Sequence, residues 1–270
     1  METVLDLASR NHLKARIQAV LALSEQLTAP LIYADVGALW GVDSPLLKML
    51  RDQQRMKIIG FEIDPAECER LKAISPNDTY LAFGVGDVDA MRPFYVTAFA
   101  ANSSFLEPDL DALAGLPHRD IFRVVSTGTA PMRRFDTLIA TGTVPVPTFL
   151  KIDAQGFEYN VLRGFGAELQ NVLGIRLETQ LRSLYKGQAL FHDIYELLKS
   201  NGFMLRDVRI TYPFEYEVVE LEVFFSRDPR HVAGGNSSRP LRIWELIHDI
   251  PSGRTIGLEN GRVNWLTLPI

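Results

Sequence analysis

The stretch that decides the fold is Leu31-Ile-Tyr-Ala-Asp35-Val-Gly-Ala-Leu-Trp-Gly41. Leu31–Ala34 are apolar and predict a buried strand, and the loop after them carries an acid and two glycines. Gly37 and Gly41 allow a sharp backbone turn and a close approach to a ligand. An open α/β sheet binds its ligands beyond the carboxyl ends of its strands, where this loop lies. The stretch therefore predicts a nucleotide site on an α/β sheet.

Two further sites follow the next predicted strands. Glu62 and Ile63 end the strand Lys57–Phe61, about 20 residues beyond the glycine loop, as in nucleotide-binding folds. A carboxylate at that place can accept two hydrogen bonds from a ribose diol. Gly86 and Asp87 follow the strand Thr79–Phe83, and Asp87 is a candidate acceptor for an adenine amino group.

The residues of the glycine loop indicate which nucleotide binds. A dinucleotide fold needs G-x-G-x-x-G, but Asp35 stands at the first of these glycines and Trp40 at the third. The Asp35 carboxylate would repel a pyrophosphate, whereas it would attract the ammonium and sulfonium groups of S-adenosylmethionine. The loop therefore favours S-adenosylmethionine over NAD.

The rest of the chain predicts a doubly wound, mostly parallel sheet, because strands and helices alternate along it. The further strands are Thr148–Asp153 and Val172–Leu177, and Gly202–Val208 and Val218–Ser226 are a closing antiparallel pair. The predicted helices span about 13–27, 45–51, 65–74, 158–164 and 188–200, with a short one at about 241–247.

We expect residues 1–30 to be a helical extension, 31–226 the catalytic domain, and 227–270 a linker and tail. Residues 98–134 interrupt the rhythm and predict loops and minor elements, with Met132–Arg134 in solvated loop. Phe94, Tyr95 and Phe99 are expected in the core or on a strand face. Residues 227–240, which include Gly-Gly-Asn-Ser-Ser, predict a mobile linker.

Composition narrows the class of protein. Of the 270 residues, 47% are hydrophobic and 23% charged, which is typical of a globular enzyme. A net charge of −5 offers no general attraction to nucleic acid or an anionic membrane. A single cysteine, Cys68, the absence of an export-like opening segment and the lack of a spanning apolar run favour a cytoplasmic protein without a membrane span.

Several motifs in the same order resemble the FkbM family of methyltransferases, over roughly residues 31 to 226. They are Tyr33-Ala-Asp-Val-Gly-Ala38, Gly60-Phe-Glu-Ile-Asp-Pro65, Ser103-Ser-Phe-Leu-Glu-Pro108, Phe149-Leu-Lys-Ile-Asp-Ala-Gln-Gly-Phe-Glu158 and Leu184-Tyr-Lys-Gly-Gln188. The fourth is the most specific, because it is similar to the family's hallmark Lys-Ile-Asp-x-(Glu/Gln)-Gly-x-Glu. One departure is Leu39, where the family usually carries Asn.

The resemblance implies a Rossmann-like fold of the class I methyltransferase type, with S-adenosylmethionine as cofactor. It also implies O-methylation of a hydroxyl on a small metabolite or a sugar unit of a glycan. N-methylation on the same fold, or a catalytically silent cofactor-binding or scaffold protein, are the alternatives.

Candidate catalytic residues follow from the needs of methyl transfer, which are alignment of the acceptor, exclusion of water and a base for a hydroxyl proton. Asp153 is expected at the carboxyl end of its strand beside the cofactor. Glu158 begins the next helix, where a carboxylate is also favoured by the helix dipole. Glu178 ends the following strand. Sulfonium chemistry needs no Lewis acid, so no metal is expected.

Overall fold

The computed structural model describes residues 4–42, 44–214, 217–232, 237–250, 254–259 and 262–267. The main sheet contains β1 (Leu31–Val36), β2 (Met56–Phe61), β3 (Thr79–Leu81), β7 (Phe149–Ile152), β8 (Gly174–Gln180), β9 (Phe203–Phe214) and β10 (Glu217–Arg227). A smaller sheet contains β4 (Gly84–Val85), β5 (Ala90–Thr97) and β6 (Val124–Arg133), and β11 (Arg254–Glu259) pairs with β12 (Arg262–Thr267).

The helices are α1 (Val4–Ser24), α2 (Pro45–Asp52), α3 (Pro65–Ile74), α4 (Phe135–Ala140), α5 (Glu158–Gly164), α6 (Phe191–Ser200), α7 (Pro229–Val232) and α8 (Ser238–Ile247). Short 3-10 turns are η1 (Ala100–Asn102), η2 (Arg119–Phe122) and η3 (Gly166–Asn171). The helices at 45–52 and 65–74 start as their sequences predict, with proline at the first position. The side chains of Ser44 and Asp64 cap them by accepting backbone hydrogen bonds.

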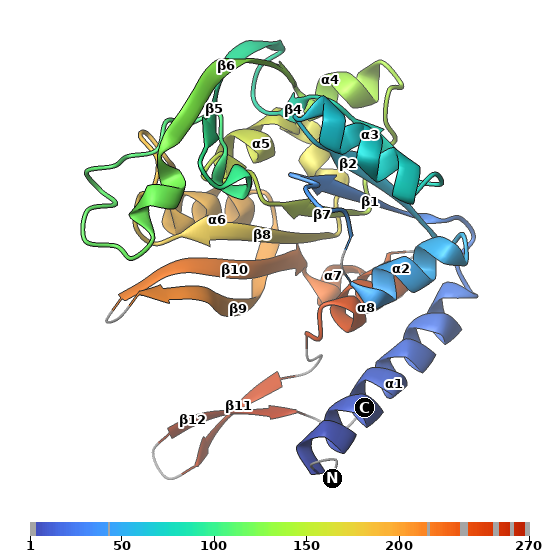
Figure 1. Ribbon diagram of the computed structural model, residues 1–270. Helices are drawn as coiled ribbons and strands as arrows, with labels where there is room; N and C mark the ends of the chain where they lie inside the picture. Colours follow the sequence, from blue (N-terminus) through green and yellow to red (C-terminus); the bar gives the residue numbers. More distant parts are fainter. Residues whose placement is uncertain are drawn as a thin grey trace.

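The main sheet has the order β3-β2-β1-β7-β8-β10-β9 (Figure 1). From β3 to β8 all neighbouring strands are parallel, and β10 runs antiparallel to both β8 and β9. This order, which grows outward in both directions from β1, confirms the predicted doubly wound fold with a closing antiparallel pair. Because strand order reverses between β1 and β7, a ligand crevice is expected at their carboxyl ends.

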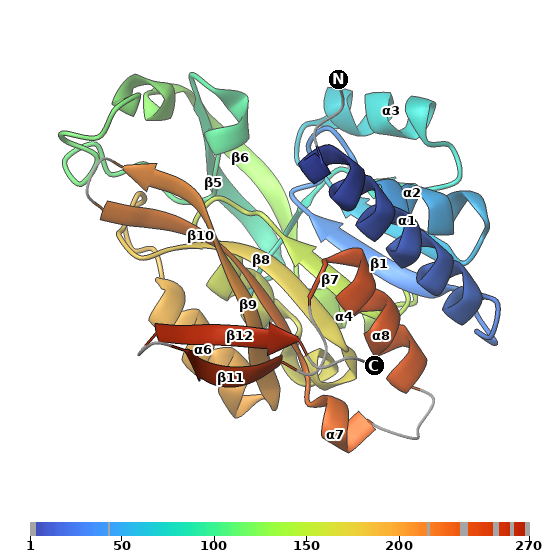
Figure 2. The same ribbon diagram turned by 90° about the horizontal axis from the view of Figure 1, so that it is seen from below.

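Both faces of the main sheet are buried, as parallel strands require. Tyr33 and Phe149 pack on one face in a cluster with α2 and α8, whereas Ala34 and Leu150 pack on the other face with α4, α5 and α6. Figure 2 shows α1, α2 and α8 together beside β1. The alternation of side chains along each strand therefore supplies two cores from one sheet.

Residues 98–134 differ from the prediction of loops and minor elements, because they contain the ten-residue strand β6. It pairs antiparallel with β5 and parallel with β4, forming the second sheet. Met132 is fully buried in it, so the prediction of solvated loop at Met132–Arg134 is wrong for this residue. The sequence does not predict this strand, because its first residues are mostly exposed and because Gly128 and Pro131 are unusual inside a strand.

Residues 227–240 also differ in part from the predicted mobile linker. Arg227 still belongs to β10, and the short helix α7 follows it. Asp228 explains the helix start, because its carboxylate accepts the backbone N–H of Arg230 at 2.9 Å and Pro229 occupies the first helical position. Residues 233–236 lie outside the described part of the chain.

The predicted helix at 241–247 is confirmed as α8, which packs against α1 and the sheet. Its Trp244 is fully buried and lies against Gly174 of β8, where any added side chain would collide with the indole. The division of the chain into an extension, a domain and a tail stays a prediction. Within the described residues, no helix has the length and apolar character that crossing a membrane would require.

Candidate active site

A cavity of about 860 Å³ opens at the carboxyl ends of the parallel strands. Val36, Phe61 and Asp153 line it at the ends of β1, β2 and β7, and Glu178 lines it from β8. The second sheet lines the other side, through residues of β5, β6 and the segment between them. This is the crevice that the reversal of strand order predicts, and its volume is typical of a small-molecule site.

The charged side chains of this cavity all have one sign. Those among the described lining residues are Glu62, Asp64, Asp153, Glu178 and Glu220, and none of the lining residues is a lysine or arginine. Like charges raise one another's electrostatic energy, so this arrangement is favourable only with a compensating cation or with protons. The cavity is therefore suited to a cationic ligand and unsuited to a pyrophosphate.

Lys151 joins the glycine loop to the end of β7. Its Nζ donates to the carbonyl oxygen of Gly37 at 2.8 Å and lies 3.0 Å from Oδ1 of Asp35 and 3.6 Å from Oδ2 of Asp153. Burial raises the pKa of Asp35, and Lys151 opposes that shift. Asp35 is thus buried in an ion pair and is not a lining residue of the cavity, so its predicted contact with the cofactor stays a prediction.

Gln155 joins two of the predicted catalytic carboxylates. Its Nε2 donates to Oδ1 of Asp153 at 2.9 Å and to Oε1 of Glu178 at 3.1 Å. Its Oε1 accepts from the Tyr185 hydroxyl at 3.0 Å, so the amide is held from both ends. Burial, and then repulsion from Asp153 and Glu220, raises the pKa of Glu178 well above its usual range. The structure therefore brings Asp153 and Glu178 together at the cavity.

Glu158, the third catalytic candidate, lies beneath this network and is almost completely buried. Its Oε1 accepts the backbone N–H groups of Ala154 at 3.0 Å and Gly156 at 3.1 Å. It therefore fixes the turn that presents Asp153 and Gln155, and it is not a lining residue. Burial, followed by a minor repulsion from Asp153, raises the pKa of Glu158 to about 8.

Of the predicted cofactor residues, Gly37, Glu62 and Ile63 line the cavity. Burial raises the pKa of Glu62, although its Oε1 accepts the backbone N–H of Asp64 at 2.9 Å. Gly37 has φ +76°, and a Cβ there would lie 1.9 Å from the carbonyl oxygen of Asp153. A glycine is thus required for the loop to pack against the end of β7.

Gly41, Gly86 and Asp87 lie outside the cavity lining. Gly86 is packed against Met132 and Phe157, and Asp87 accepts from Nδ2 of Asn160 at 3.2 Å. Gly41 has φ +76°, which supports the predicted sharp turn. Cofactor contacts by these residues stay predictions.

Several lining residues were not identified from sequence. Glu220 and Gln155 are not among the site residues that the sequence predicts. Gln155 lies in the family hallmark, which could have indicated it. Phe94 and Phe99, expected in the core or on a strand face, line the cavity, and Phe99 is 46% exposed. The second sheet brings them there, and no sequence pattern indicates that sheet.

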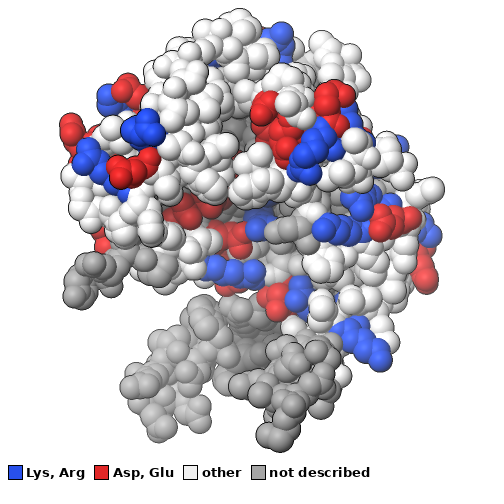
Figure 3. Space-filling view, in the orientation of Figure 1, with Lys and Arg blue, Asp and Glu red and all other residues white. Residues whose placement is uncertain are grey.

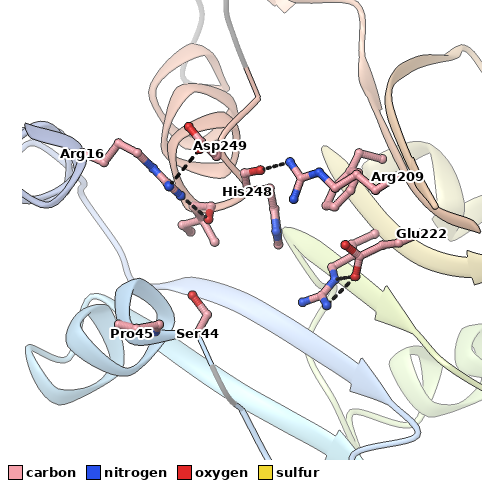
Figure 4. A pocket seen from close by; sticks show the side chains of 10 residues that line it. Arg16, Ser44, Pro45, Arg209, Glu222, His248 and Asp249 are labelled. Atoms are coloured by element: carbon pink, nitrogen blue, oxygen red, sulfur yellow. Dashed lines mark hydrogen bonds and ion pairs between the residues drawn. The ribbon is translucent and has the colours of Figure 1, made fainter. Parts of the chain in front are cut away.

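A second, smaller cavity of about 370 Å³ lies between α1, α8 and the strands β8 and β10 (Figure 4). Arg16 lies 3.3 Å from Asp249, and Arg176 and Arg209 form ion pairs with Glu222 and Asp207. Arg16 also donates to the carbonyl oxygens of Leu246 and Ile247 at the end of α8, both at 2.8 Å. Figure 3 shows acidic and basic side chains together in the recess across this face. Here charges of both signs neutralise one another.

The described residues contain no cluster of three or more His, Cys, Asp or Glu side chains arranged to hold a metal ion. The expectation that the reaction needs no metal stays a prediction.

Residues 35–205 match the model of the methyltransferase FkbM domain. No curated protein matches the chain.

Similar solved structures include a TehB-like SAM-dependent methyltransferase from Corynebacterium glutamicum, with 13% identity, coverage of 79% of this chain and 87% of that one, and a TM-score of 0.36. Another is magnesium protoporphyrin IX methyltransferase from Synechocystis with bound SAM, with 11% identity, 83% and 82% coverage, and a TM-score of 0.37.

Proposed function

The chain belongs to the FkbM family of S-adenosylmethionine-dependent methyltransferases, and from this premise we propose that it methylates a hydroxyl group of a small metabolite or sugar unit. The family match covers more than half of the 270 residues. The observation that carries the proposal is the network in which Gln155 holds Asp153 and Glu178 at the same cavity.

The residues present fit the cofactor of the family. Its methyl group is already activated by a sulfonium cation, and every charged lining residue of the cavity is an acid. Glu62, directly after β2, lines the cavity and would accept hydrogen bonds from a ribose diol, and Gly37 and Ile63 would line the same part of the site. These contacts would identify the residues of this chain that bind the cofactor.

Asp153 is the proposed base for the acceptor hydroxyl. Its carboxylate is partly exposed, with 37% of the side chain accessible, and it lines the cavity. Gln155 occupies Oδ1 and Lys151 lies on the side of Oδ2, so the carboxylate is fixed before any acceptor arrives. Such positioning supports proton transfer, which requires the base to lie within hydrogen-bond reach of the hydroxyl. Glu178, with its raised pKa, would bind a second hydroxyl of the acceptor.

A second candidate is N-methylation, which the same acidic lining favours. An amine acceptor carries a positive charge at neutral pH, which Asp153 and Glu220 could stabilise. Glu178, with its pKa raised to about 10, would be protonated and could only accept or donate a neutral hydrogen bond. The two candidates differ in their acceptors, so a panel of matched compounds separates them.

The test begins with binding. We expect S-adenosylhomocysteine to bind more tightly than NAD in a competition titration, and equal or tighter NAD binding would contradict the cofactor fit. Turnover is then measured on extracted glycans, sugars and simple alcohols, and on the corresponding amino sugars and amines. Methylation of amines without methylation of any hydroxyl compound would replace the proposed function by the second candidate.

A further inference from the structure

Two exposed aromatic side chains face each other at the cavity. Trp40, in the loop after β1, is 65% exposed, and Phe99, before η1, is 46% exposed. Both line the cavity, and their ring centroids lie 6.4 Å apart at an interplanar angle of 48°. Exposing two large apolar rings side by side at a cavity is unfavourable, and a ligand that covered them would remove this cost.

The backbone of each aromatic residue is held in place. The N–H of Trp40 donates to Oε1 of Glu67 at 3.1 Å, and Arg70 binds that carboxylate in turn. Phe99 donates its N–H to the carbonyl oxygen of Ile121 at 3.1 Å, and its own carbonyl oxygen accepts from the Thr97 hydroxyl at 2.7 Å. The rings are therefore presented by fixed backbone, which limits the entropy lost when a ligand binds.

Trp40 has φ +68°, a left-handed conformation that a bulky residue adopts only against an energetic penalty. A glycine would occupy this position without strain. The chain thus places a large aromatic side chain where local backbone preference disfavours it, and the side chain obtains no compensating burial in the core. Such a combination of strain and exposure points to a role in binding.

We propose that Trp40 and Phe99 form an aromatic clamp that binds the flat face of a ring-shaped methyl acceptor and thereby selects ring compounds over open-chain polyols. This inference rests on the proposed function. Rings stack on aromatic faces through apolar contact, while ring hydroxyls point outward along the ring edge. Asp153, Gln155 and Glu178 line the same cavity and can accept or donate hydrogen bonds at that edge.

The clamp assigns different tasks to the parts of the cavity. The acids at the ends of β7 and β8 bind hydroxyl groups, which an open-chain polyol also carries. The exposed rings of Trp40 and Phe99 are the groups proposed to distinguish a closed ring from an open chain. Removing them should weaken ring acceptors while leaving the cofactor in place.

The test uses the full chain saturated with S-adenosylhomocysteine. Tryptophan emission is followed while a set of methyl pyranosides and simple phenols is added, each compared with sorbitol as the open-chain control. Ring compounds are expected to quench the emission of the wild type, and the Trp40→Phe variant, which retains Trp244 and Trp265, identifies the part of the signal due to Trp40.

Steady-state turnover on the best ring acceptor gives the second readout. Trp40→Ala and Phe99→Ala are expected to raise KM about tenfold with kcat changed less than about twofold, while Trp40→Phe stays within about threefold. Ile74→Ala is the matched control, because Ile74 is 58% exposed and outside the cavity lining. Trp40→Gly should raise KM as Trp40→Ala does without lowering Tm, because it relieves the left-handed strain.

Four results would overturn the clamp, and the first three concern binding and KM. They are quenching by ring compounds no stronger than by sorbitol, equal loss of S-adenosylhomocysteine affinity in the Ala variants, and an unchanged KM in Trp40→Gly. Equal methylation of sorbitol and ring compounds would remove the clamp and leave the proposed O-methylation standing. Quenching by ring amines, with amines alone being methylated, would remove the proposed function and leave the clamp standing.

Discussion

The two cavities of this molecule use charged residues in opposite ways. In the cavity at the strand ends, all charged lining residues are acids, and Gln155 holds two of them, Asp153 and Glu178, together. In the cavity beneath α8, the arginines are paired with carboxylates or with carbonyl oxygens of the α8 terminus. A surplus of one charge is unfavourable for stability and useful for binding, whereas balanced pairs serve stability. The comparison therefore supports the proposed function for the first cavity and a role in fold stability for the second.

The largest expected effect that tests this comparison comes from Asp153→Asn. If Asp153 takes the acceptor proton, turnover should fall by about 10²–10⁴-fold while S-adenosylhomocysteine affinity and Tm stay unchanged. Single-turnover kinetics and calorimetry measure these quantities. Asp249→Asn, which changes the same group in the second cavity, is the control and should leave turnover intact. Normal turnover in a well-folded Asp153→Asn protein would exclude the base.

Glu62→Ala should weaken S-adenosylhomocysteine binding by about tenfold to a hundredfold, because two charge-assisted hydrogen bonds are lost, worth about 1.5–3 kcal/mol. Titration calorimetry on the purified variant measures the change. Glu222→Gln in the second cavity should leave the affinity as it is. An unchanged dissociation constant in Glu62→Ala would remove Glu62 from the cofactor site.

Unlike Glu62→Ala, Arg16→Ala should lower the stability of the fold and leave the affinity for S-adenosylhomocysteine unchanged. Arg16 donates to two carbonyl oxygens at the end of α8, so its removal should lower the free energy of unfolding by about 1.5–3 kcal/mol. Denaturant titration gives this value, and S-adenosylhomocysteine affinity at low denaturant should match that of the wild type. If affinity fell and stability did not, the assignment of the second cavity to fold support would be wrong.

The last expected effect is a pH dependence and concerns Glu158, whose folded pKa of about 8 lies above its ordinary value of 4.5. Between these pH values the folded chain holds a proton that the unfolded chain has released. The stabilisation is complete below the unfolded pKa and is lost as pH rises through the folded pKa, by at most about 1.4 kcal/mol per pH unit.

Glu158→Gln should therefore remove a component of the decline in unfolding free energy between about pH 5 and pH 8. Denaturant titrations of both proteins at several pH values measure the difference. Parallel pH profiles for the two proteins would show that Glu158 is ionised in the folded state throughout this range.

Much of the main sheet could be predicted from sequence because its signals are local. The apolar run at Leu31–Ala34, the glycines after it, and the proline starts of α2 and α3 each act within a few residues. The hallmark around Lys151–Glu158 likewise placed Asp153 at a strand end. Such short-range patterns fix an element without knowledge of its partners.

The second sheet could not be predicted, because its stability depends on pairing between segments about 35 residues apart. Tyr95 pairs with Thr127, and neither segment shows a clean alternation of apolar and polar residues. The same limit applies to the site. Glu220 lines the cavity from β10, far along the chain from Asp153, whereas Asp35 is not a lining residue and forms an ion pair with Lys151. Only the folded sheet determines which acids meet.

The position of the second sheet has a consequence for the evolution of this protein. All lining residues between Phe94 and Pro131 come from one continuous segment, whereas Gly37, Glu62 and Asp153 come from separate strand ends of the main sheet. Under the proposed function, this one segment supplies Phe99 to the acceptor site, whereas Asp153, Glu178 and Trp40 belong to the main sheet and its loops. Recombination at the two ends of this segment could replace it as one unit. Related proteins would then differ in their substrates while they keep the same cofactor site.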